Sequence, residues 1–76
     1  MNILQLCCFE ESVKIFDYLT RFLNNDSAIK FELAKHRDNV MGVQAIHLAS
    51  AGGNRYFIDK LIEQYGADPK EKTEYN

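Results

Sequence analysis

Apolar side chains recur at helical spacing between residues 13 and 23, and charged or polar side chains separate them. A period of three to four residues predicts an amphipathic helix over this stretch. Ser12 stands directly before it and can accept a hydrogen bond from a free amide of the first turn, which favours a helix start there. The apolar positions are Ile15, Phe16, Leu19, Phe22 and Leu23.

The second half of the chain carries a similar pattern with a turn before it. Small residues fill a short helix expected over 45–51, and Gly52-Gly53-Asn54 favours a reversal of the chain. Between residues 55 and 65 one face is apolar and the other is charged, which predicts a second amphipathic helix. Gly66 follows it, as a glycine often follows a helix end. The apolar positions are Phe57, Ile58, Leu61 and Ile62.

Residues 24–37 lie between these two regions and predict a further helix. Asn25, Asp26 and Ser27 are good residues for a helix start. Cationic side chains stand at the expected C-terminal end, where the helix dipole favours them. We therefore expect an inserted helix, packed beside the first helical region. Its apolar stripe is Ile29, Leu33 and Ala34, and its C-terminal cations are Lys35, His36 and Arg37.

The stretch from residue 42 to residue 68, GVQAIHLASAGGNRYFIDKLIEQYGAD, resembles the ankyrin repeat. The pattern of that family is roughly G-x-T-P-L-H-x-A-x-x-G-(H/N)-x-x-x-(I/V)-x-x-L-(L/I)-x-x-G-A-D. Ile46-His47 stands for the Leu-His pair, and Gly42 for a turn glycine that favours a positive φ. Gln44-Ala45 replaces Thr-Pro, and Tyr65 lengthens the second helix by one residue. The resemblance implies an all-α fold, an ankyrin-repeat helical solenoid of about two helix pairs.

A weaker copy of the unit lies upstream, at an offset of 42 residues that places Leu4 on Ile46. A standard ankyrin repeat has about 33 residues, so the inserted helix accounts for the extra length. The copy is degenerate at the family's histidine and at its two glycines, where it has Gln5, Glu11 and Asn24. We expect one domain over 1–76: a degenerate repeat (1–24), the inserted helix (25–37), a consensus-like repeat (38–69) and the start of a next hairpin (70–76).

Composition and charge narrow the class of partner. The net charge is −2, from 9 basic and 11 acidic residues without a block of like charge, so we expect neither nucleic acid nor membrane as the main partner. No apolar run approaches transmembrane length, and no secretory signal is visible. Cys7 and Cys8 are adjacent and too close for a relaxed disulfide, which favours a reducing, intracellular location, cytoplasmic or nuclear.

No motif in the chain predicts catalysis, so we expect a protein that is not an enzyme and has no cofactor. His47 has no nucleophile or carboxylate at a fixed spacing, and the resemblance gives its imidazole a structural role between repeats. Neither the cysteines nor the histidines have the spacing of zinc ligands. Cys7 is expected to pack as a small apolar group, whereas a partly exposed Cys8 would be open to acylation or oxidation.

The resemblance implies a protein–protein interaction module that binds its partner through hairpin tips and short inner helices, as a regulator or inhibitor. A diverged first repeat followed by an insertion is similar to the ankyrin inhibitors of Rel-type transcription factors, including virus-encoded ones. The alternative is a capping or array segment of a larger ankyrin protein, whose uncapped C-terminal face would drive self-association. The expected contact residues are the non-consensus positions: Phe9, Glu10, Asn39, Val40, Met41, Val43, Ala51, Gly52, Glu71, Lys72 and Glu74. Val40 and Met41 would be exposed apolar contacts at a hairpin tip, or would pack against the inserted helix.

Overall fold

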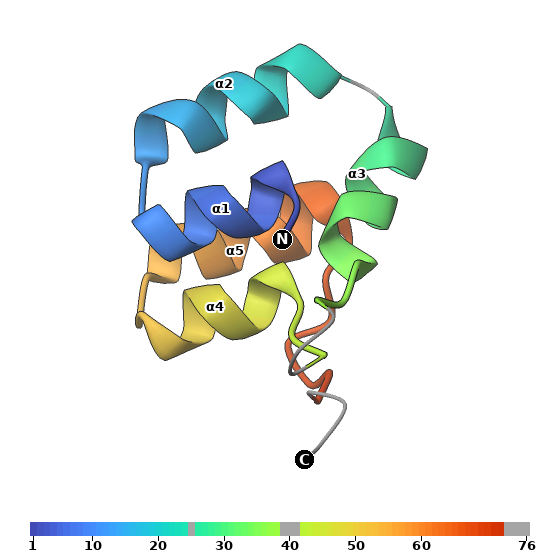
Figure 1. The fold of residues 1–76 in the computed structure, drawn as a ribbon. Coiled ribbons are helices and arrows are strands. Elements are labelled where there is room, and N and C mark those ends of the chain that lie inside the picture. Colours follow the sequence, from blue (N-terminus) through green and yellow to red (C-terminus); the bar gives the residue numbers. More distant parts are fainter. Residues whose placement is uncertain (25, 39–41, 73–76) are drawn as a thin grey trace.

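The computed structural model describes residues 1–24, 26–38 and 42–72, which within those ranges form five α-helices and no strand (Figure 1). The predicted all-α class is therefore confirmed. The helices expected over 13–23, 45–51 and 55–65 have the bounds that the apolar pattern indicated, and the inserted helix is present. The elements are α1 (Ile3–Glu10), α2 (Val13–Leu23), α3 (Ser27–Lys35), α4 (Ala45–Ala51) and α5 (Arg55–Tyr65).

The helix pairs α1–α2 and α4–α5 are built on the same plan at the offset of 42 residues. Both α2 and α5 have 11 residues. They begin at equivalent caps: the Ser12 hydroxyl accepts a hydrogen bond from the Ile15 amide, and the Asn54 side chain accepts one from the Phe57 amide. Each of these bonds satisfies an amide that has no partner inside its helix.

Positive φ angles also recur at equivalent places in the two pairs. Glu11 and Gly53, in the turns between the paired helices, have φ of 54° and 67°. Asn24 and Gly66, which end α2 and α5, have φ of 51° and 71°. The first pair thus places residues with a Cβ where the second has glycine, in a backbone region that L side chains disfavour.

Figure 1 shows α1 between α2 and α4, with α5 behind and α3 across the end where α1 and α4 begin. The inserted helix packs against α1, α4 and α5. It therefore covers one end of both pairs. This placement leaves the opposite end, with the α1–α2 and α4–α5 turns, open.

The core between the pairs is largely aromatic. Phe16 of α2 stacks on Phe57 of α5, with ring centroids 4.7 Å apart and planes 12° apart. Tyr65 meets Phe16 edge to face at 5.7 Å, and its hydroxyl lies 2.8 Å from that of Thr20, so its polar tip is satisfied inside the core. Other buried apolar residues are Leu4, Cys7, Cys8, Ala34, Ala45, Ile46, Ala49, Leu61 and Ala67.

The apolar residues of α2 divide into two faces, which corrects the single stripe expected. Phe16 is fully buried, whereas Ile15 is 53% exposed and Phe22 72% exposed. Consecutive residues of a helix point about 100° apart, so Ile15 and Phe16 cannot pack on the same neighbour. A second apolar face of α2 is consequently open to solvent.

The stripe expected on α3 is also partly wrong. Ala34 is buried and Leu33 packs against the core, but Ile29 is exposed and Lys30 is buried instead. The Lys30 ammonium lies 5.8 Å from the centre of the Tyr65 ring. The aliphatic stem can cover apolar surface while the charge meets the electron-rich ring face, which explains a buried lysine here.

Candidate functional site

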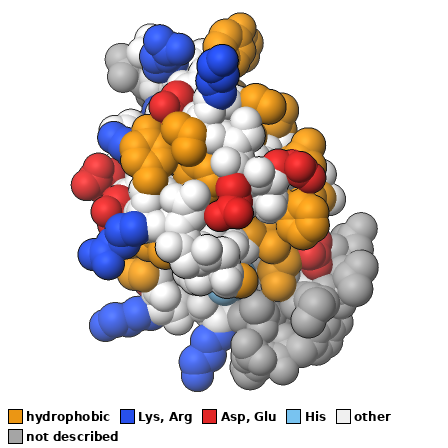
Figure 2. Space-filling view, turned by 90° about the vertical axis from the view of Figure 1, so that its left-hand side faces the viewer, with side chains coloured by type: hydrophobic (Ala, Val, Ile, Leu, Met, Phe, Trp, Pro, Cys, Tyr) orange, Lys and Arg blue, Asp and Glu red, His pale blue; other side chains and the backbone are white. Residues whose placement is uncertain are grey.

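An open cleft of about 280 Å³ lies between the C-terminal ends of α1 and α4. Phe9 of α1 lines it with 62% of its surface exposed. Ala51 ends α4, and Gly52 is the C-cap. Figure 2 views the side of the molecule that carries the helix-pair turns, where hydrophobic side chains form separate groups among charged ones. The lining residues are Cys8, Phe9, Glu11, Leu48, Ala51 and Gly52.

Two small residues keep this cleft open. A Cβ at Gly52 would lie 3.4 Å from a carboxylate oxygen of Glu11, so a larger residue there would reduce the space beside that carboxylate. The lining joins apolar groups to a single carboxylate. This arrangement suits an apolar side chain of a partner with a hydrogen-bond donor or a cation beside it.

The thiol in the cleft wall is not chemically available. Cys8 is 2% exposed, so the expectation of a partly exposed, modifiable cysteine is wrong. Burial, with a smaller contribution from neighbouring Cys7, raises the pKa of the Cys8 thiol to about 12. Burial likewise raises the pKa of Cys7. Because the thiolate is the nucleophile, both side chains act as small apolar groups, as expected for Cys7.

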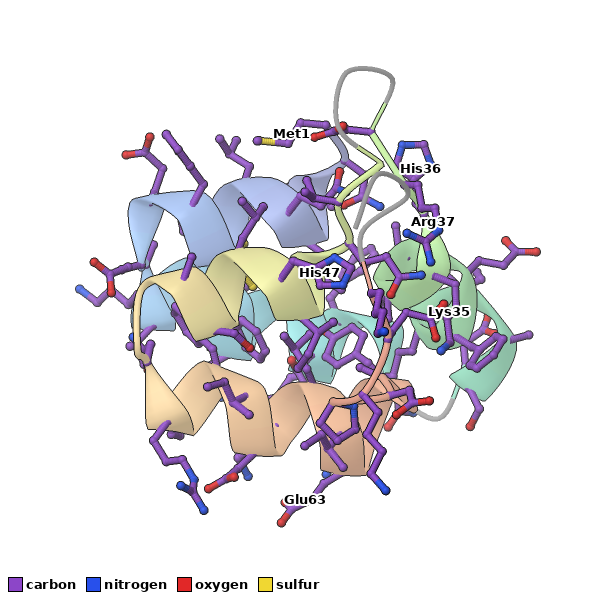
Figure 3. All side chains as sticks on the ribbon, turned by 90° about the horizontal axis from the view of Figure 1, so that it is seen from below. Met1, Lys35, His36, Arg37, His47 and Glu63 are labelled. Carbon is purple, nitrogen blue, oxygen red and sulfur yellow. The ribbon has the colours of Figure 1, made fainter. Side chains whose placement is uncertain are left out.

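Arg37 organises the opposite end of the molecule. Its Nη1 donates hydrogen bonds to the carbonyls of Gly42 and Lys72, at 2.7 and 2.9 Å. Its Nη2 lies 2.9 Å from Oε1 of Glu71. The guanidinium therefore ties the segment after α3 to the segment after α5, and Figure 3 shows Arg37 and His47 at this end.

His47 bridges α4 to the same C-terminal segment. Its Nδ1 accepts a hydrogen bond from the Gln44 amide at 2.7 Å. Its Nε2 lies 2.8 Å from the Glu71 carbonyl, an acceptor, so Nε2 carries the proton. The imidazole thus bonds backbone groups of a helix start and of a following segment, the structural role expected for it.

Gln5 makes the corresponding bridge in the first pair. Its Oε1 accepts a hydrogen bond from the Asn2 amide at 2.7 Å. Its Nε2 donates to the carbonyls of His36 and Val43 at 3.1 and 3.0 Å. An amide side chain, like a neutral imidazole, offers one acceptor and one donor group. The glutamine at the histidine position of the degenerate copy therefore preserves the bridge.

The structure separates the expected contact residues into groups. Phe9, Ala51 and Gly52 come together in the cleft, whereas Glu10 lines a different groove on α1. Val43, Glu71 and Lys72 lie at the opposite end, where Arg37 engages both Glu71 and the Lys72 carbonyl. Four expected residues lie outside the described part of the chain: Asn39, Val40, Met41 and Glu74.

Sequence reasoning missed two residues of the cleft, Glu11 and Leu48. Leu48 occupies a position that the repeat pattern leaves unspecified. Glu11 was identified only as a departure from glycine. Its place between α1 and α2 is the signal that could have found it, because both inner helices end at the same side of a helix-pair repeat.

Among the described residues, no group of three His, Cys, Asp or Glu side chains is arranged to hold a metal ion. In that same part of the chain, no helix has the length and hydropathy needed to span a bilayer. Comparison with protein-family models, curated proteins and solved structures finds no match for this chain.

Proposed function

We propose that this chain is a protein-binding module of the ankyrin type, an intracellular helical solenoid segment that binds a partner protein at the α1–α4 cleft. The observation that carries the proposal is the convergence of Phe9, Ala51 and Gly52 in one open cleft. The repeat pattern selected these three residues as contacts before any geometry was considered. Such a segment would act as a regulator or inhibitor by occupying a surface of its partner.

The relation between the helix pairs supports the ankyrin assignment. Offsets of 42 residues relate the bounds of α2 and α5, their caps, and the positive φ angles at their ends. The bridges of Gln5 and His47 correspond in the same way. Repeat architectures stack such units side by side and use their inner helices and turns as a binding surface.

The chemistry of the cleft specifies the kind of partner surface. Phe9 is a large exposed aromatic group, and aromatic anchors near the centre of an interface carry much of its binding energy. The Glu11 carboxylate is exposed and forms no ion pair within the described residues. The expected partner element therefore presents an apolar side chain with a lysine or arginine beside it.

A matched pair of substitutions tests the proposal. Ala51→Arg fills the cleft from an exposed position at the end of α4, whereas Ala28→Arg makes the same change at an exposed alanine of α3. The immobilised wild type and Ala28→Arg chains should capture the same proteins from a cell extract. Ala51→Arg should lose those proteins while keeping the wild-type circular dichroism spectrum. Phe9→Ala should weaken capture about tenfold or more, since it removes the aromatic anchor.

Two results would contradict the proposal. Equal capture by the wild type, Ala51→Arg and Ala28→Arg would show that binding does not use the cleft. Loss of capture only in chains substituted at the Arg37 end, for example Lys72→Glu, would place the contact surface at that opposite end.

A further inference from the structure

A second surface, remote from the cleft in its lining residues, is formed by one face of α1 and one of α2. We call it the α1–α2 apolar face and define it by Ile3, Leu6, Ile15, Tyr18 and Phe22. All five side chains are at least 48% exposed. Contiguous apolar surface of this kind on a small domain marks a contact region.

The face contains a hollow. A groove of about 130 Å³ lies between α1 and α2, lined by Ile3, Leu6, Cys7, Glu10, Ser12 and Ile15. An apolar cavity of similar size can hold a benzene ring, so the groove has room for an aromatic side chain.

The same face also contains a projection. The rings of Tyr18 and Phe22, one turn apart on α2, stack with centroids 6.2 Å apart and planes 19° apart. They are 63% and 72% exposed. Ile15 lines the groove and also a shallow hollow with Tyr18, so projection and groove adjoin. A face with both a hollow and an aromatic projection can fit a second copy of itself, as a two-fold interface requires.

Charges on the face complement each other in the same sense. Glu10 borders the groove on α1, and Lys14 and Arg21 border the hollow beside Tyr18 on α2. None of these three side chains forms an ion pair within the described residues. When two copies meet about a two-fold axis, the acidic border of each can oppose the basic border of the other.

The internal repeat supplies a further argument. Ile15 is the counterpart of Phe57 at the offset of 42, and Phe57 is buried against Phe16 of the neighbouring pair. The α1–α2 apolar face therefore contains the position through which one helix pair receives another. Here that position is exposed.

We propose that the chain forms a two-fold symmetric homodimer through the α1–α2 apolar face. Tyr18 and Phe22 of each copy occupy the groove of the other, and Glu10 of each copy faces Lys14 or Arg21 of the other. This differs from the self-association expected through the C-terminal face. It is independent of partner binding, because the groove and the α1–α4 cleft share no lining residue.

Light scattering after size-exclusion chromatography, over a concentration series, tests the face. The mass of the wild type should rise from one chain to two. Ile15→Asp, at an exposed position, should raise the dimer Kd about tenfold or more, since it places a charge in the apolar contact. The matched control Ile62→Asp, on exposed Ile62 of α5, should leave the Kd unchanged. A wild type that stays monomeric up to millimolar concentration, or a dimer lost only in Ile62→Asp, would overturn the proposal.

Charge reversal tests the two-fold symmetry. Glu10→Lys leaves only basic side chains on the borders, and Lys14→Glu makes them mainly acidic, so each variant alone should dimerise at least about threefold more weakly. An equimolar mixture should form heterodimers at least as tight as the wild-type dimer, because every contact across the axis is then attractive. Mixing that restores nothing would exclude this interface, and since both positions are exposed, circular dichroism should show both variants folded.

Discussion

The two helix pairs share their helix bounds, caps and bridges, yet they differ in how much of each is covered. The second pair lies against the first pair and against α3. The first pair has its α1–α2 apolar face in solvent. The clearest contrast is at one repeat position, where Phe57 is 0% exposed and Ile15 is 53% exposed. Local sequence therefore sets the plan of each pair, while its neighbours decide which apolar residues become core.

The largest effect should come from truncating the two residues at that shared position. Phe57→Ala removes a ring stacked in the core and should cost about 3–5 kcal/mol of unfolding free energy, enough to unfold a small domain. Ile15→Ala should cost less than about 0.5 kcal/mol in the monomer, where its side chain is largely solvated. Urea unfolding followed by circular dichroism at low micromolar concentration measures both. Equal losses would mean that the pairs are equally covered.

The bridging residues offer the next contrast. Gln5→Ala should cost about 2–3 kcal/mol, because it removes three hydrogen bonds at a fully buried site. His47→Ala should cost about 1–2 kcal/mol, since it removes two bonds at a partly exposed one. The exchanges Gln5→His and His47→Gln should each retain part of the stability that alanine loses. If the exchanges are as harmful as alanine in the same urea experiment, the two bridges are not equivalent.

Backbone geometry gives a smaller effect with opposite signs in the two pairs. Glu11→Gly and Asn24→Gly should each stabilise the chain by about 0.5–1 kcal/mol, because glycine adopts their positive φ without strain. Gly66→Ala should cost about 1–2 kcal/mol. Its new Cβ would lie 3.1 Å from the Phe31 ring in addition to the strained φ. Thermal melts of the four single variants, with Gly53→Ala as the one free of any neighbour, would show the sign; destabilisation by both glycines would contradict it.

The smallest effect appears only in alkali. The pKa of Cys8 rises from 9.0 unfolded to about 12 folded through burial, so the unfolded chain loses its thiol proton first. Stability from this group is complete below pH 9 and declines as pH rises from 9 towards 12. Burial raises the pKa of Tyr65 as well, and that contribution has the same sign. The fall in unfolding free energy between pH 8 and 10.5 should therefore be shallower in Cys8→Ala than in the wild type, and an unchanged slope would count against a buried thiol.

The sequence predicted the helices well because their signals are local. Caps at Ser12 and Asn54, the glycines around α5 and the apolar period each act within a few residues. It could not decide which face of α2 enters the core, since Ile15, Phe16 and Phe22 are all apolar and only the position of α5 separates them. The burial of Lys30 was equally hidden, because it depends on the Tyr65 ring, 35 residues later in the chain.

The cleft was predictable in part for the same reason. The repeat pattern located Phe9, Ala51 and Gly52, since these positions have a fixed place within a unit. It could not show that Glu71 is held by Arg37, because that ion pair joins segments 34 residues apart. Nor could it indicate that Gln5 keeps the role of a histidine, which depends on where two later carbonyls come to lie.

The bridge of Gln5 has a consequence for synthesis on the ribosome. Its amide donates to the carbonyls of His36 and Val43, and the Asn2 side chain donates to that of Leu33. At roughly 5–20 residues per second, these acceptors are made about 2–8 s after the residues they hold. The start of α1 therefore waits, unfinished, while translation proceeds through α3 and into the following turn. A nascent chain stalled before Val43 would present its first helices incompletely anchored, at the stage when chaperones and proteases meet it.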